Sequence, residues 1–305
     1  MSENKHLTLE KDPAAFIKEF IKSFVAESPE NKLHLIDDSP IWEEPLVGFA
    51  DGEDPLFYEY KKIIGDFHLT PREILEKTFA VTNNSIDREL SNISVICWAL
   101  PVAKRTVQSN AKRDNWPSLR WAHTRQYGEM LNGILRRELA SLLTAKGYFA
   151  VAPFRSPLYR HIHGPRYPRQ DSGDPTRYPT SNWSERHALY VAGMGTFGLH
   201  DGLITSRGTA IRAGSVVVNM KIPPTPRPYN SPYEYCPFFT DKSCGMCIDR
   251  CPTGAIGING HDKIKCDMYG HVTLAQCRVW YEVERFGCAL CMTGVPCTSK
   301  IPPKA

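Results

Sequence analysis

The chain has 305 residues, 42% of them hydrophobic, which is enough for one large or two medium-sized domains with a sizeable core. A formal net charge of +4 is too small to indicate nucleic-acid binding by itself. No apolar run approaches the roughly 18 residues of a membrane-spanning helix. The first residues, Met1-Ser-Glu-Asn-Lys-His6, carry neither the apolar segment of a signal peptide nor a twin-arginine leader. We therefore expect a cytoplasmic protein that does not bind membranes.

Two helices are predicted near the N-terminus. Asp12 and Pro13 form an N-cap and first-turn pair, and an apolar stripe follows them. The segment Thr70-Pro-Arg-Glu73 is a capping box and predicts the start of a second helix, with Ile74 and Leu75 behind it. The residues of the first stripe are Phe16, Ile17, Phe20, Ile21 and Phe24.

A long helix is predicted from about 123 to 146, with Gly147 as its end. Three apolar segments, 93–100, 148–152 and 215–219, predict strands, and Cys97 in the first is expected to be an inert core thiol. Helices that alternate with strands predict a layered α/β domain over 1–220. The residues expected on the inward side of the long helix are Met130, Leu131, Ile134, Leu135, Leu139, Leu142 and Leu143.

A change of composition separates this domain from the rest of the chain. The segment 221–232 contains five prolines, which suit neither a helix nor a central strand. Nine of the ten cysteines lie between Cys236 and Cys297. The sequence therefore predicts a linker over 221–235 and a second, cysteine-rich domain over 236–305.

The run Cys244-x2-Cys247-x3-Cys251-Pro252 resembles a bacterial ferredoxin motif, in which closely spaced thiolates hold a four-iron cluster and the last cysteine reaches a second one. The resemblance implies a ferredoxin-like domain that holds two [4Fe-4S] clusters. With the usual crossed ligation, one cluster would be held by Cys236, Cys244, Cys247 and Cys297. The other would be held by Cys251, Cys277, Cys288 and Cys291.

The sequence departs from that motif at two points. Cys236 lies eight residues before Cys244 instead of three, and five residues instead of three lie between Cys291 and Cys297, with a proline before Cys297 instead of after it. Nine thiols exceed the eight that two clusters need, so either Cys266 or Cys277 is surplus. We prefer Cys277 as the ligand, because it lies eleven residues before Cys288 and leaves room for a helix that folds back on the cluster.

Disulfides and structural zinc are the alternative interpretations of the cysteines. A disulfide scaffold is typical of a small secreted domain, which the N-terminus does not suggest. The pairs Cys244-x2-Cys247 and Cys288-x2-Cys291 could form one zinc site of four thiolates. That site would leave five further cysteines without a role, so iron–sulfur clusters are favoured.

A glycine-rich segment, 190–218, precedes the linker. A helix capped by Ser184 is expected to end at Gly193, and two short strands are expected after a turn that lets backbone approach a large ligand. Alone, Gly193-x-Gly195-x-x-Gly198 is weak and equally suits a tight turn. It is not a dinucleotide fingerprint, because it follows a helix.

Together with the cysteine motif, the segment 192–216 resembles the cobalamin-dependent epoxyqueuosine reductases and reductive dehalogenases, and the likeness covers about two-thirds of the chain. It implies an α/β nitroreductase-like fold that binds base-off cobalamin, with two [4Fe-4S] clusters that supply electrons. It also implies cobalamin contacts from seven residues: Gly193, Met194, Gly195, Gly198, Arg212, Gly214 and Ser215.

The chain departs from the epoxyqueuosine reductases at their catalytic aspartate, because alignment on Glu185-Arg186 places Pro179 there. Reductive dehalogenases use a tyrosine as proton donor, and Tyr178 is the best-placed candidate. The basic stretch from Arg155 to Arg177 could be a solvated loop, a lid over an anionic ligand or a minimal RNA contact. His68 is expected to be structural, with no protein ligand below the cobalt.

The leading hypothesis is an oxidoreductase in which cluster-to-cobalt electron transfer drives reductive removal of halide or oxygen from a small organic substrate. A low-potential ferredoxin or flavodoxin is the expected electron donor. One alternative is an epoxyqueuosine reductase that acts on tRNA, which is possible but not favoured. Another is an electron-transfer or corrinoid-reactivating protein with no small-molecule substrate of its own.

Overall fold

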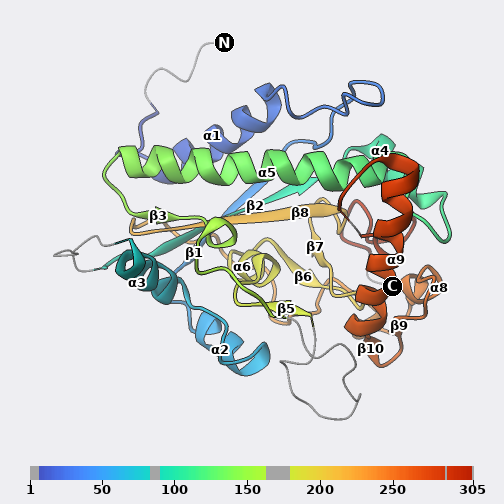
Figure 1. Ribbon diagram of the computed structural model, residues 1–305. Coiled ribbons are helices and arrows are strands. Elements are labelled where there is room, and N and C mark those ends of the chain that lie inside the picture. The colour runs from blue at the N-terminus through green and yellow to red at the C-terminus, as the bar shows by residue number, and fades with distance from the viewer. Residues whose placement is uncertain (1–6, 83–89, 163–178, 286, 304–305) are drawn as a thin grey trace.

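A four-stranded sheet forms the centre of the computed structural model, which describes residues 7–82, 90–162, 179–285 and 287–303 (Figure 1). The strands are β1 (Leu46–Asp51), β2 (Ser94–Pro101), β8 (Ile211–Val218) and β3 (Ala150–Val151), in that spatial order and antiparallel throughout. The three strands predicted from sequence are confirmed, although the segment predicted at 148–152 pairs over only two residues.

Strand β2 lies inside the sheet, and all eight of its residues are buried. Because successive side chains point to opposite faces, a strand covered on both sides reads as a continuous apolar run. Cys97 is fully buried, and burial raises the pKa of its thiol well above the ordinary value. This confirms Cys97 as a protonated core thiol.

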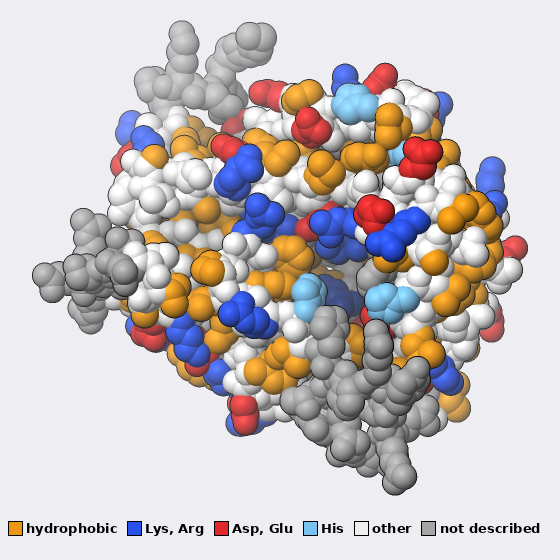
Figure 2. Space-filling view, viewed as in Figure 1, with side chains coloured by type: hydrophobic (Ala, Val, Ile, Leu, Met, Phe, Trp, Pro, Cys, Tyr) orange, Lys and Arg blue, Asp and Glu red, His pale blue; other side chains and the backbone are white. Residues whose placement is uncertain are grey.

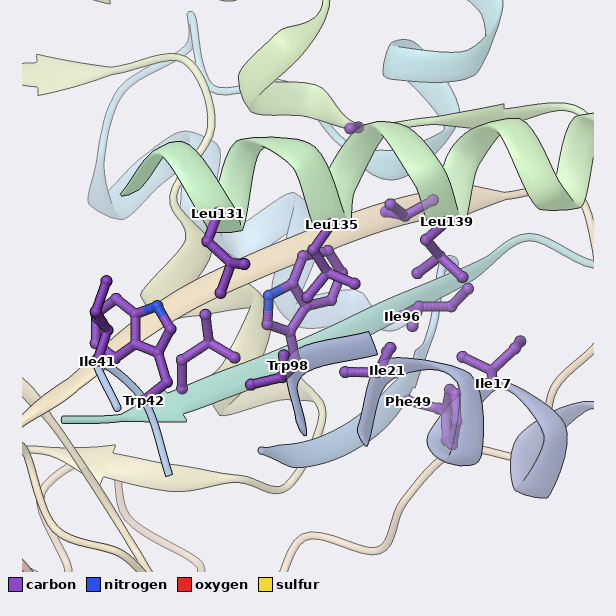
Figure 3. Packing of buried hydrophobic residues seen from close by; sticks show 14 of the residues in the cluster. Ile17, Ile21, Ile41, Trp42, Phe49, Ile96, Trp98, Leu131, Leu135 and Leu139 are labelled. Atoms are coloured by element: carbon purple, nitrogen blue, oxygen red, sulfur yellow. The ribbon is translucent and has the colours of Figure 1, made fainter. Parts of the chain in front are cut away.

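Helices α1 (Pro13–Glu27) and α5 (Leu119–Ala145) cover one face of the sheet. Asp12 caps α1 by accepting a hydrogen bond from the amide of Ala15 at 2.9 Å, as predicted. Ile17 and Leu135 pack toward Trp98 of β2 in the core between these layers (Figure 3).

One expectation for the inward side of α5 is wrong. Met130 is 51% exposed, whereas the neighbouring Glu129 is buried. The prediction fails because polar residues, and not apolar ones alone, occupy the face of α5 that meets the sheet. The helix ends as predicted, since Gly147 follows its C-cap with φ +87°.

The opposite face of the sheet is covered by α2 (Pro55–Ile63), α3 (Pro71–Val81) and α6 (Glu185–Val191). The predicted capping box opens α3: the Glu73 amide donates to Oγ1 of Thr70 at 3.2 Å, and the Thr70 amide donates to Oε2 of Glu73 at 2.9 Å. Ile74 and Leu75 are buried behind it.

Shorter elements complete the described part of the chain. Two hairpins, β4–β5 and β6–β7, lie before β8, and the cysteine-rich segment carries small helices and one long helix, α9. No helix among the described residues is long and apolar enough to cross a membrane. The bounds are α4 (Lys104–Ala111), η1 (Pro153–Arg155), β4 (His161–Ile162), β5 (Thr180–Ser181), β6 (Gly195–Phe197), β7 (Leu203–Thr205), α7 (Pro237–Thr240), α8 (Met246–Asp249), β9 (Ile256–Gly257), β10 (Gly260–His261), α9 (Lys263–Tyr281) and η3 (Leu290–Met292).

The proline-rich segment 221–235 contains neither helix nor strand, but it is packed against the sheet. Thr225 donates its amide to the carbonyl of Phe49 at 2.9 Å, and its hydroxyl accepts from the Phe49 amide at 3.0 Å. The cysteine-rich segment is attached as closely, since the amide of Thr209 donates to the carbonyl of Cys297 at 2.8 Å. The thiols are therefore held against the α/β layers.

Candidate functional site

Four thiols of the cysteine-rich segment converge near α8. Burial raises the pKa of Cys297 to about 12, and the neighbouring Cys236, Cys247 and Cys244 add to the shift. A thiolate raises the pKa of another thiol only when the two are close, so the four sulfurs lie near one another. They come from the N-cap of α7, the loop before α8, α8 itself and the loop after η3. The structure thus brings together all four residues of the first predicted ligand set.

A second group of thiols lies beside the first. Burial raises the pKa of Cys291 well above its ordinary value, with further contributions from Cys288, Cys266 and Cys251. Cys247 of the first group also acts on Cys291, which shows that the two groups are neighbours. Burial opposes ionisation of Cys251, but Thr253 and nearby backbone amides outweigh it and lower the pKa of that thiol.

Cys266 and Cys277 occupy opposite ends of α9, and Cys288 of the second group acts on both thiols. Burial raises the pKa of Cys266 to about 11, followed by the effects of Cys288 and Cys251. Cys277 is buried against Ala122 and Val283, and burial, followed by the effect of Cys288, raises its pKa to about 11. The preference for Cys277 over Cys266 as a ligand stays a prediction.

Among the described residues, no group of three or more His, Cys, Asp or Glu side chains is arranged to hold a metal ion. A zinc ion draws its sulfurs to within about 2.3 Å of one point, whereas a four-iron cube places a separate iron at each thiolate. The pairs Cys244–Cys247 and Cys288–Cys291, which the zinc interpretation combined, belong to different groups. A set of four converging thiols fits the donor requirement of a [4Fe-4S] cluster.

Arg186 lies near the second thiol group, because the thiols of Cys266 and Cys291 act on its guanidinium. Burial among protein atoms is the largest cause that lowers its pKa, although the residue is solvent exposed. Figure 2 shows a hollow below α5, bordered by a band of Lys and Arg side chains, with His side chains at its rim.

A polar stripe on α5 faces the sheet beside this hollow. It consists of Arg125, Glu129, Asn132 and Arg136, spaced so that all four lie on one side of the helix. Arg136 is 1% exposed and donates to Oε1 of Glu129 at 2.9 Å, and Arg212 of β8 donates to Oε2 of the same carboxylate. Burial would raise the pKa of Glu129, but Arg212 and Arg136 outweigh it and lower the pKa to about 2.

A second carboxylate, Glu185 at the start of α6, is 13% exposed and bonds to Ser215 of the sheet. Burial raises its pKa, although its Oε1 is 3.3 Å from Nη2 of Arg136. Ser215 of β8 is fully buried, donates its hydroxyl to Oε2 of Glu185 at 2.5 Å and accepts from the indole nitrogen of Trp183 at 3.1 Å. The structure thereby gives Ser215 a position in a buried network beneath the hollow.

The glycines of the predicted turn are explained by contacts within the protein. Gly193 has φ +72°, and an added Cβ would lie 2.4 Å from the carbonyl oxygen of Pro226. An added Cβ at Gly195 would meet the Ile204 carbonyl at 2.3 Å, and one at Gly214 would meet the Trp98 ring at 2.4 Å. At Gly198 it would lie 2.9 Å from the His200 ring.

Met194 and Arg212 differ in their surroundings. Met194 packs on the core beneath the sheet, whereas Arg212 pairs with Glu129 of the polar stripe on α5. Of the seven residues predicted to contact cobalamin, Arg212 is therefore the one whose side chain joins this stripe. The roles of the other six in cofactor binding stay predictions.

Tyr178, the predicted proton donor, lies outside the described residues. Tyr159 is a described tyrosine near the hollow: burial raises its pKa, and Glu185, Arg212 and Arg136 all act on its hydroxyl. His68 is 1% exposed, and burial lowers its pKa to about 4. Its ring stacks on Trp183 with centroids 5.9 Å apart, which fits the structural role expected for it.

Sequence reasoning missed most of the charged residues of the site, namely Arg125, Glu129, Arg136 and Arg186. The signal that could have found them is the recurrence of polar residues at helical spacing in a helix that is otherwise buried. Burial of such polar groups costs free energy unless they are paired with one another. The sequence analysis used Glu185 and Arg186 only as the fixed point of an alignment and predicted no role for them in the site.

No protein-family profile and no curated protein sequence matches this chain. Solved structures do match it. A reductive dehalogenase, described with a mechanism for B12-dependent dehalogenation, aligns with 98% of this chain and 34% of its own, at 15% identity and a TM-score of 0.52. Epoxyqueuosine reductase from Bacillus subtilis aligns with 95% of this chain and 66% of its own, at 16% identity and a TM-score of 0.47. An epoxyqueuosine reductase with a tRNA stem loop aligns with 93% of this chain and 64% of its own, at 17% identity and a TM-score of 0.47.

The chain therefore spans just under two thirds of the epoxyqueuosine reductases, at 66% and 64% of their lengths, and 34% of the dehalogenase. The chain has the mixed α/β fold of that reductive dehalogenase.

Proposed function

We propose that this chain is a cobalamin- and iron–sulfur-dependent reductase that removes halide or oxygen from an organic substrate. The observation that carries the proposal is the position of Arg186, whose guanidinium is affected both by Arg212, which pairs with Glu129 of α5, and by the thiols of Cys266 and Cys291. A redox cluster at these thiols would be adjacent to whatever the hollow binds. Adjacency of this kind is what electron transfer between two cofactors requires.

Two groups of four thiols would hold two clusters. The first comprises Cys236, Cys244, Cys247 and Cys297, as the sequence predicts. For the second we propose Cys251, Cys266, Cys288 and Cys291, with Cys266 in place of Cys277. The second group would be the inner cluster, because it is the one that Arg186 contacts electrostatically.

The hollow would bind cobalamin with its lower base detached. When bound, cobalamin would supply the low-potential reduction that breaks a carbon–halogen or carbon–oxygen bond. Arg212 would line the hollow, while Gly193 and Gly214 would shape its wall through close internal packing. His68 is sealed among aromatic rings, and we propose no protein ligand to the cobalt.

The protein would also deliver a proton to the substrate. Tyr178 remains our proposal for the donor, and it follows from the resemblance to reductive dehalogenases. Replacement by Phe should lower turnover by roughly the 10²–10⁴-fold typical of a lost general acid. Iron content and corrin binding should stay unchanged in Tyr178→Phe, because neither needs this hydroxyl. Turnover of Tyr178→Phe equal to that of the wild type would exclude Tyr178 as the proton donor.

A low-potential donor such as ferredoxin or flavodoxin would reduce the first cluster. Apolar side chains near this group are accessible to a partner, since Phe239 is 38% exposed and Met246 is 46% exposed. Lys242 lies over the rings of Phe238 and Phe239, at 4.8 Å and 5.9 Å. A basic and apolar surface would suit an acidic electron carrier.

Turnover by protein reconstituted anaerobically with iron, sulfide and cobalamin tests this function. A chemical reductant would replace the donor, and halogenated aromatic compounds and tRNA that carries epoxyqueuosine would be supplied separately. Release of halide is the expected result. Reduction of the tRNA alone would move the assignment to epoxyqueuosine reductase, and turnover of neither would favour an electron-transfer protein.

A further inference from the structure

The turn between β6 and β7 holds an imidazole ring against a thiol of the first group. His200 lies in this turn and is 5% exposed. Its Nε2 is 3.5 Å from Sγ of Cys297, and its Nδ1 accepts a hydrogen bond from the amide of Gly202 at 2.9 Å. The ring therefore bridges the glycine-rich segment and the cysteine-rich segment.

The contact with Gly202 decides which ring nitrogen carries the proton. A backbone amide can only donate, so Nδ1 of His200 presents a lone pair to it. An imidazole with a lone pair on Nδ1 carries its hydrogen on Nε2. His200 is therefore the donor in its contact with Cys297, and the sulfur accepts.

Two glycines leave room for the ring in this position. An added Cβ at Gly198 would lie 2.9 Å from Cε1 of His200, and one at Gly202 would lie 2.7 Å from the same atom. The amide of Gly198 also donates to the carbonyl of Gly202 at 2.8 Å, which closes the turn around the imidazole. The glycines of this turn are thus required by the placement of His200 beside Cys297.

The same turn packs on other thiols of the first group. Leu199, which precedes His200, belongs to one apolar cluster with Cys236 and Cys247, and Cys297 packs against that cluster. The backbone of Cys297 is also fixed, because its carbonyl accepts the amide of Thr209 at 2.8 Å. His200 therefore reaches the first thiol group from the side of the α/β layers.

We propose that His200 is a positioning residue that sets the reduction potential of the first cluster by donating a hydrogen bond to the thiolate of Cys297. The inference rests on the proposed function, because it needs the [4Fe-4S] cluster proposed for the first thiol group. Hydrogen bonds to ligand sulfurs are among the factors that set cluster potentials. The bond withdraws charge from the sulfur and so stabilises the reduced state, which carries one more negative charge. His200 should therefore raise the potential of this cluster.

Redox titration followed by electron paramagnetic resonance tests the inference on protein that holds both clusters. His200→Asn keeps an acceptor for the Gly202 amide but is too short to donate to Cys297. Loss of the hydrogen bond should lower the equilibrium constant for reduction of one cluster about tenfold, which is about 59 mV for a one-electron couple. The other midpoint potential should not change. His200→Gln, whose longer amide can reach the sulfur, should restore most of the wild-type value.

His68→Phe is the matched control, because His68 is also buried but stacks on Trp183. It should leave both midpoint potentials unchanged. Pulsed electron paramagnetic resonance adds a direct measurement on protein with isotopically labelled histidine rings. The reduced wild-type protein should show a weak coupling to a ring nitrogen, and His200→Asn should lose it.

Unchanged midpoint potentials in His200→Asn, with both clusters present, would overturn the inference and leave the proposed function intact. If His200→Asn does not retain the first cluster, His200→Gln and the wild-type nitrogen coupling decide. A wild-type protein without that coupling, or a midpoint potential that falls equally in His200→Asn and His200→Gln, would overturn the role of His200. A wild-type protein that holds no iron–sulfur cluster would reject the proposed function, and the inference with it.

Discussion

Cys266 and Cys277 lie on the same side of α9, three helical turns and about 16 Å apart along its axis. A single cluster cannot use both thiols at that separation. Cys251 and Cys288 act on Cys266, and Cys288 also acts on Cys277, which packs on Ala122 and Val283. We therefore expect Cys266→Ser to lose one cluster and to fall from about eight to about four iron atoms per chain.

Cys277→Ser is the matched control for that change, because it removes a thiol from the other end of the same helix. It should keep about eight iron and eight sulfide per chain. Chemical quantification and electron paramagnetic resonance of the reduced protein would measure both variants. Loss of iron in Cys277→Ser with full iron in Cys266→Ser would restore the ligand choice made from the sequence.

Glu129 pairs with the buried Arg136 and the partly exposed Arg212, so its replacement should strongly destabilise the fold. Glu129→Gln would leave Arg136 and Arg212 without their shared carboxylate and should lower the free energy of unfolding by about 3–5 kcal/mol. Glu138→Gln on the exposed side of α5 should change it by less than about 1 kcal/mol. Denaturant unfolding at pH 7 would measure the difference, and equal stabilities would exclude a structural ion pair at the hollow.

The contribution of Glu129 should also depend on pH. Its folded-state pKa of about 2 lies below the ordinary value of about 4.3. A lowered carboxylate pKa stabilises the fold above the unfolded-state pKa, and the effect is lost as the pH falls toward 2. The stability difference between wild type and Glu129→Gln should be constant above about pH 5 and shrink below it. A difference that is unchanged at pH 3 would contradict this assignment.

His68 should make the fold sensitive to mild acid. Burial lowers its pKa from 6.5 to about 4, so the folded state excludes a proton that the unfolded state accepts. Stability should therefore fall as the pH drops from 6.5 toward 4, by about 2 kcal/mol at pH 5. His68→Phe would keep the stacking on Trp183 and remove this loss. Identical pH profiles of wild type and His68→Phe would be the contrary result.

Gly214 should tolerate no side chain, since an added Cβ would lie 2.4 Å from Cε2 of Trp98. Gly214→Ala should cost about 1–3 kcal/mol through overpacking and disturb the 2.8 Å bond from the Trp98 indole to Asn132. Gly133→Ala is the control, because nothing lies within 4 Å of its added Cβ and alanine favours a helix by about 1 kcal/mol. Thermal unfolding of both variants would test the packing explanation.

Local signals predicted several elements of the fold. The Asp12 cap and the Thr70–Glu73 capping box act through neighbouring residues, and the apolar run of β2 follows from burial on both faces. The cysteine spacing likewise indicated converging thiols. These features depend on short stretches of chain, which a single sequence displays directly.

Features that depend on contacts between distant segments could not be predicted in the same way. The inward side of α5 was misjudged because Glu129 pairs with Arg212, 83 residues further along the chain. The space beside Gly193 is filled by Pro226 of the linker, which no local pattern reveals. The choice between Cys266 and Cys277 depended on where α9 meets the other thiols.

Quantification of iron, sulfide, zinc and corrinoid in anaerobically reconstituted protein tests the central claim most directly. Two thiol groups beside a charged hollow predict about eight iron, about eight sulfide and one corrinoid per chain. Electron paramagnetic resonance of the bound corrinoid should show no nitrogen ligand below the cobalt. About one zinc per chain without sulfide, or full clusters without any corrinoid, would contradict a cobalamin-dependent iron–sulfur reductase.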